Sequence, residues 1–174
     1  MKTKRNLLRT LAATVALVTA SMTTPLAAQT GGPIGTPNYV PGYSFPYGQG
    51  CGSSFMGPIH LTLGTIPDIG TDALFELTNG VPGNPAWLLL GFVPMNTDLT
   101  PIGAWGCHLY VNPVVTVAKN ITAVGTAEFE YAIPMNTSLI GVHLFAQGVA
   151  QDVMANAFGL VLTNGIEMSI GGTP

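Results

Sequence analysis

Charged residues are scarce in this chain of 174 residues: Lys, Arg, Asp and Glu make up 7% of it, against ~25% in an ordinary soluble domain. After residue 28 there is no arginine, and Lys119 is the only lysine against eight Asp and Glu, a net charge of −7. Nucleic acids and anionic membranes need clustered Lys and Arg, so the sequence argues against both as partners. It also lacks the forked guanidinium groups that bind phosphate or carboxylate substrates.

Long apolar runs are lacking too, and we expect no membrane-spanning helix. Residues 11–20 are apolar but short, and they follow a basic head and precede the small-residue stretch Pro25-Leu-Ala-Ala28. This order is typical of a secretory signal peptide. An amphipathic surface helix is the weaker alternative, because the four basic residues lie at one end rather than on one face. We therefore expect residues 1–28 to be a signal peptide and the protein to be secreted or held in the cell envelope.

Only two cysteines occur, Cys51 and Cys107, and no Cys-x-x-Cys motif supports redox or zinc chemistry. In an exported protein a single cysteine pair favours a disulfide. Closing a loop of this size would stabilise the fold by roughly 4 kcal/mol in the chain-entropy model. A reactive thiol is the alternative, but it would need nearby cations to lower its pKa, and the chain has almost none.

Three histidines, His60, His108 and His143, are weak candidates for metal ligands, since each falls on the polar face of an expected strand. They could bind a metal only if their strands were neighbours. Neither His-x-His nor His-Glu-x-x-His spacing occurs. We therefore expect no metal and no cofactor.

Catalytic motifs are missing as well. No serine lies in a Gly-x-Ser-x-Gly elbow. Glu128 and Glu130 share one face of an expected strand, where we expect them to be solvated, whereas a glycosidase needs two carboxylates facing each other across a cleft. We expect no catalytic residue and no enzymatic activity. A secreted hydrolase ranks third among the functions considered, and two carboxylates meeting in a concave pocket would favour it.

Hydrophobic residues make up 47% of the chain, with 22 glycines and 14 prolines between short alternating segments. Alternation of apolar and polar residues indicates half-buried strands. It is found at residues 59–63, 75–78, 107–111, 115–117, 129–133, 140–147 and 160–170, whereas residues 87–92 are apolar on both faces and are expected to form a central strand. We predict an all-β fold of about eight or nine strands, a two-sheet antiparallel β-sandwich of the jelly-roll or Greek-key type. Asn164-Gly165 is predicted to be a two-residue hairpin turn.

Residues 29–50 form a Gly/Pro/Tyr-rich arm, and residues 51–174 a single β-sandwich domain. Proline and glycine exclude a helix or a central strand in the arm. Its aromatic residues, Tyr39, Tyr43, Phe45 and Tyr47, either fasten the arm to the outside of the domain or form a stacking surface for a sugar or peptide. We favour fastening, because sugar-binding rings need a rigid scaffold. Trp87 and Trp105 are the other candidates for ligand stacking.

Several segments along the chain form a recognisable set: Tyr47-Gly-Gln-Gly-Cys51, Pro58-Ile-His-Leu-Thr-Leu-Gly-Thr-Ile-Pro67, Ala86-Trp-Leu-Leu-Leu-Gly91, Gly106-Cys-His-Leu-Tyr-Val111, Gly141-Val-His-Leu-Phe-Ala-Gln147 and Gly159-Leu-Val-Leu-Thr-Asn-Gly165. Together they resemble a family of small secreted modules common in planctomycete-type bacteria. The resemblance implies a β-sandwich with a Cys51–Cys107 link. The family has no assigned activity, so no catalytic residue is carried over.

The sequence thus favours a secreted structural or binding module of the cell surface or exterior, with other cell-surface proteins or glycans as partners. A carbohydrate-binding module is the alternative. Three tyrosines aligned on one exposed face would support sugar binding, and buried rings would argue against it.

Overall fold

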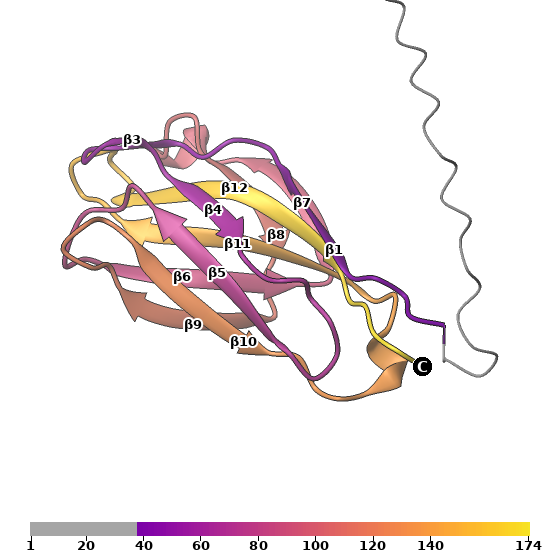
Figure 1. Cartoon of the computed structure of the whole chain (residues 1–174). Coiled ribbons are helices and arrows are strands. Elements are labelled where there is room, and N and C mark those ends of the chain that lie inside the picture. Colours follow the sequence, from indigo (N-terminus) through magenta and orange to yellow (C-terminus); the bar gives the residue numbers. More distant parts are fainter. Residues whose placement is uncertain (1–37) are drawn as a thin grey trace, which may run out of the picture. The chain divides into compact units, whose positions relative to one another are not determined.

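Residues 38–174 are described by the computed structural model and form twelve strands and two short 3₁₀ helices, with no α-helix in this part of the chain (Figure 1). The predicted all-β fold is confirmed. Frequent glycine and proline interrupt the chain before a helix can form, and β-branched and aromatic residues favour strands between them. The predicted signal peptide and the first residues of the predicted arm lie outside the described residues.

The largest sheet has five antiparallel strands. In spatial order they are β1 (Tyr43–Tyr47), β12 (Leu160–Ser169), β11 (His143–Gln151), β6 (Pro85–Gly91) and β9 (Val115–Asn120). The edge strand β1 comes from the segment predicted as an arm. Its Pro46, which has no N–H to donate, is tolerated because an edge strand is paired on one side only.

A second sheet has three strands, and two ribbons have two strands each. The three-stranded sheet consists of β10 (Ala127–Ala132), β5 (Asp72–Thr78) and β4 (His60–Leu63). The ribbons are β2–β3 (Gly52–Ser53 and Gly57–Pro58) and β7–β8 (Val93–Asp98 and His108–Asn112), and the 3₁₀ helices are η1 (Thr100–Ile102) and η2 (Thr137–Leu139). With twelve strands in four sheets, the finer prediction of eight or nine strands in a two-sheet sandwich is not confirmed. Every residue of β7 is exposed, so this strand lacks the alternation of apolar and polar residues by which strands were predicted from the sequence.

The hydrophobic core is built from alternate residues of the two larger sheets. Leu88, Ala146 and Met168 of the five-stranded sheet and the directly paired Phe75 and Phe129 of the three-stranded sheet are almost fully buried in one cluster. Burying each large side chain contributes roughly 1.5–3 kcal/mol. The alternation that predicted these strands is therefore the alternation between core and surface.

The β7–β8 ribbon covers part of the opposite face of the five-stranded sheet. Gln147 of β11 points to this face, next to the core residue Ala146, and is completely buried. Its Oε1 accepts a hydrogen bond from the Tyr110 N–H at 2.8 Å, and its Nε2 donates to the carbonyls of His108 and Thr163, both at 2.8 Å. One amide therefore joins β11 and β12 to β8 of the ribbon.

The prediction of a hairpin turn at Asn164-Gly165 is wrong, because β12 runs straight through both residues. Neither residue has the positive φ that such a turn requires. The Asn164 side chain bonds to the Leu61 backbone of β4, accepting from its N–H at 2.9 Å and donating to its carbonyl at 3.1 Å. The Tyr47 ring fills the space beside Gly165 that a side chain would need. Both residues thus serve contacts between segments rather than a turn.

Replacing Gln147 by methionine should lower the free energy of unfolding by about 3 kcal/mol, because it leaves two buried backbone groups and one half-buried backbone group without their partner. Urea unfolding measures the loss. Gln151→Met is the matched control on the same face of β11, at a half-buried position, and should cost less than about 1 kcal/mol. Equal losses in the two variants would show that Gln147 does not hold the ribbon.

Candidate functional site

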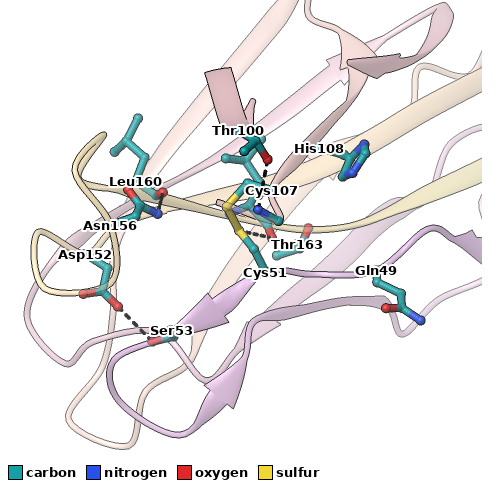
Figure 2. Close-up of a disulfide and its surroundings, with 12 residues drawn as sticks. Gln49, Cys51, Ser53, Thr100, Cys107, His108, Asp152, Asn156, Leu160 and Thr163 are labelled. Carbon is teal, nitrogen blue, oxygen red and sulfur yellow. Dashed lines mark hydrogen bonds between the residues drawn. A yellow bond between two sulfur atoms is a disulfide. The ribbon is translucent and has the colours of Figure 1, made fainter. Parts of the chain in front are cut away.

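Cys51 and Cys107 form the predicted disulfide, which ties the segment after β1 to the residue before β8 (Figure 2). The two Cα atoms lie 4.9 Å apart and are 56 residues apart in sequence. Both cysteines are buried, and no free thiol is left. The disulfide therefore fastens the ribbon to the sheet, and the alternative of a reactive thiol is excluded.

The buried carboxylate of Asp152 lies near the disulfide, and it joins two loops (Figure 2). It accepts hydrogen bonds from the Ser53 hydroxyl at 3.1 Å, from the Ser54 N–H and hydroxyl at 2.7 Å each, and from the N–H groups of Met154 and Ala155. Burial raises the pKa of Asp152, but the hydrogen bonds from Ser54, Ser53 and Met154 outweigh it and hold the pKa below the usual range. The serines are donors to a structural carboxylate.

The three histidines lie apart from one another. His108 Nδ1 is 2.9 Å from Asn96 Oδ1, and His143 Nδ1 is 2.9 Å from Glu167 Oε1. His60 is exposed on the three-stranded sheet. Within residues 38–174 no group of three or more His, Cys, Asp or Glu side chains is placed to hold a metal ion.

An exposed aromatic surface lies along the edge strand β1. The Tyr43 and Phe45 side chains are 41% and 61% exposed, and their ring centroids are 5.3 Å apart. Tyr43 also meets the His143 ring edge-on at 6.1 Å. Glu167, which pairs with His143, lies opposite Phe45 in the strand register. We call Tyr43, Phe45, His143 and Glu167 the β1 aromatic face.

The two-residue period of a strand places Tyr43, Phe45 and Tyr47 on the same face of β1. Tyr47 is half-buried: its ring meets Tyr110 at 5.5 Å, and its hydroxyl donates to the Tyr110 carbonyl at 2.9 Å. Burial, and then the nearby charge of Glu167, raise the pKa of Tyr47 to about 12. Tyr47 therefore anchors β1 against the ribbon, while Tyr43 and Phe45 stay accessible. Phe45, which continues the alternation of the tyrosines, is the most exposed ring of the three.

The other aromatic candidates do not join this face. The Tyr39 hydroxyl donates to Asp68 Oδ2 at 2.6 Å, and this bond raises the pKa of Tyr39. Trp87 is half-buried and, with Leu89 and two neighbours, lines an apolar groove of about 310 Å³. Trp105 is 73% exposed in the loop after η1. Of the five rings predicted for stacking, only Tyr43 and Tyr47 lie on β1; Trp87 is on the same face of the five-stranded sheet, but on β6.

A second hollow, of about 330 Å³, lies on the three-stranded sheet. Glu76 of β5 and Glu128 of β10 stand directly opposite each other there, and Glu130 and Lys119 line the same groove. All three glutamates are exposed, as predicted for Glu128 and Glu130. Like charges placed opposite each other in a sheet are destabilising. Two carboxylates thus meet in a concave surface, the feature that would favour a hydrolase.

No protein-family model, curated protein or solved structure matches this chain. The resemblance to exported planctomycete-type modules therefore stays a prediction. In the described part of the chain, no helix has the length and apolar character needed to cross a bilayer.

Removing the disulfide with Cys51→Ser and Cys107→Ser together should lower the free energy of unfolding by roughly 4 kcal/mol, because the unfolded chain gains the entropy of an open loop. Urea unfolding with and without reductant measures it. Reductant should destabilise the natural protein by a similar amount and leave the double variant unchanged. A natural protein that is indifferent to reductant would contradict this role.

Acid should destabilise the protein partly through Asp152. Its pKa is lower in the folded protein than the ~3.9 of an unfolded aspartate, so its contribution is complete above that value and is lost as the pH falls through the folded pKa. Asp152→Asn should be less stable at neutral pH, because its NH₂ group faces donors, and should lose less stability on acidification. Unfolding curves measured from neutral to strongly acidic pH test this. Parallel pH profiles for the two proteins would refute it.

Proposed function

We propose that this protein is a secreted, non-catalytic binding module that acts at the cell surface or exterior and holds an uncharged carbohydrate on the β1 aromatic face. The observation that carries the proposal is the exposure of Tyr43 and Phe45 on a strand that is paired with β12 over five residues. Binding residues on strands are held more precisely than residues on loops. The objection that the tyrosines lie on a flexible arm does not apply to Tyr43.

The chemistry of this face fits a sugar. Aromatic rings supply apolar contact area at small entropic cost, and a few placed polar groups supply orientation. His143 and Glu167, 2.9 Å apart beside the rings, are available to the hydroxyl groups of a sugar. Both side chains are partly exposed, so they are accessible to a ligand. With eight acidic residues and Lys119 alone after residue 28, an uncharged ligand is favoured over an anionic one.

The place of action follows from two observations. The first 28 residues have the composition of a signal peptide. The disulfide is of a kind that forms and persists in oxidising compartments outside the cytosol. Both support export to the cell envelope or beyond.

A secreted hydrolase is the second candidate, and the meeting of Glu76 and Glu128 in the groove favours it. A glycosidase also needs one carboxyl group that stays protonated, which active sites achieve by placing it in an apolar pocket. Glu76, Glu128 and Glu130 are all exposed instead. The aromatic face therefore supports binding better than the groove supports catalysis.

Screening the purified protein on an array of neutral glycans, followed by calorimetry with the best ligand, tests the proposal. Tyr43→Ala and Phe45→Ala should each weaken binding roughly tenfold, since each removes a stacking ring. Phe92→Ala is the matched control, because Phe92 is exposed to a similar degree, at 58%, between β6 and β7. It should keep the affinity of the natural protein.

Two results would overturn the proposal. One is an array without any bound glycan. The other is release of new reducing ends from a glycan that stops in Glu76→Gln, which would establish a hydrolase at the groove.

A further inference from the structure

One end of the sheets carries a group of exposed apolar side chains on four loops. In Figure 1 the loops β2–β3, β9–β10 and β11–β12 lie at the end away from the C-terminus. Their exposed apolar residues, with those of the loop from β7 to β8, form what we call the apolar loop end: Phe55, Met56, Ile102, Trp105, Val124, Val153, Met154 and Phe158. Met154 is 81% and Val124 74% exposed.

The four loops are fastened to one another. Asp152 bonds the β2–β3 loop to the β11–β12 loop through Ser53 and Ser54. The Phe55 ring packs against Gly125 of the β9–β10 loop. Gly103 of the β7–β8 loop packs against Ala157 of the β11–β12 loop. The apolar side chains are therefore presented as one surface.

Several polar side chains in these loops are paired internally. The Asn156 amide donates to the Leu160 carbonyl at 2.8 Å and accepts from the Gly159 N–H at 2.9 Å. The Thr122 and Thr126 hydroxyls bond to each other at 2.9 Å. Some backbone groups of the turns are paired as well, including the Asp152 N–H with the Gly159 carbonyl and the Gly125 N–H with the Thr122 carbonyl. Such pairing is what a loop needs when it leaves water, because lipid offers a polar group no partner.

Charge is also scarce at this end, although Asp98, the last residue of β7, is exposed directly before the loop that carries Ile102 and Trp105. Residues 54–56, 99–106, 121–126 and 152–159 contain a single charged side chain, Asp152, and it is buried. An acidic protein without clustered Lys and Arg has no attraction for anionic lipid. The surface therefore matches a lipid interface without net charge.

We propose that the apolar loop end docks on a lipid bilayer of zwitterionic, net-uncharged composition and enters it only to the interfacial region. Trp105 and the two phenylalanines are suited to this region, where amphipathic and aromatic rings gather. The exposed apolar side chains are distributed over four loops, and a deformable lipid surface accommodates such a distribution without matched pockets. This inference is independent of the proposed sugar binding, which uses the β1 aromatic face.

Flotation of the purified protein with vesicles of pure phosphatidylcholine tests the inference. The natural protein should float with them and should bind no better when phosphatidylserine replaces part of the lipid. Trp105→Ser with Met154→Ser should weaken binding at least tenfold, since both apolar contacts are lost. Met135→Ser is the matched control: Met135 is 79% exposed outside the apolar loop end and should be dispensable.

Tryptophan fluorescence gives a second readout. Phosphatidylcholine vesicles should shift the emission to the blue through Trp105, and Trp105→Phe should abolish the shift while keeping flotation. Absence of flotation with phosphatidylcholine, or equal loss in Met135→Ser, would overturn the inference. A dimer in solution that Met154→Ser converts to a monomer would overturn it in favour of a second copy of this chain on the same surface.

Discussion

Three hydrogen bonds made by the buried side-chain amide of Gln147 hold the β7–β8 ribbon on the five-stranded sheet. They determine which part of the outer face of this sheet is covered and which part is exposed to solvent. The hydrophobic core uses one face of the five-stranded sheet, and the other face would be open to water without the ribbon. Gln147 pairs the backbone of β8 with that face, and the disulfide and the Tyr47–Tyr110 bond hold the ribbon from the side. Beyond the ribbon, Tyr43 and Phe45 remain exposed on the same face.

Scarcity of charge explains how the rest of the molecule is held together. With a single lysine after residue 28, the fold has few ion pairs available, and buried polar side chains bond to backbone groups instead. Asp152, Gln147 and Asn164 each join segments far apart in sequence in this way. The same scarcity leaves uncharged surfaces, an aromatic one along β1 and an apolar one at the loop end, and both proposed ligands are uncharged.

Alternation in the sequence predicted the core strands, because a half-buried strand must alternate. The alternation placed Gln147 on the face of its strand opposite to that of the core residue Ala146. It does not contain the position of the ribbon, and so the burial of the Gln147 side chain could not be predicted from it. Asn164-Gly165 has the composition of a turn, yet long-range bonds to Leu61 and the close approach of Tyr47 hold it extended. The pairing of Glu76 with Glu128 also depends on strand order, which a periodic pattern does not contain.

We propose that the uncovered part of the outer face of the five-stranded sheet, along β1, is the binding surface. Backbone NMR of the labelled protein during titration with a neutral oligosaccharide tests it most directly, since every strand is observed at once. The account predicts that the largest chemical-shift changes fall on Tyr43, Phe45, His143 and Glu167, with little change at Glu76 and Glu128. Changes concentrated at the glutamate groove, or no change with any neutral glycan, would contradict it.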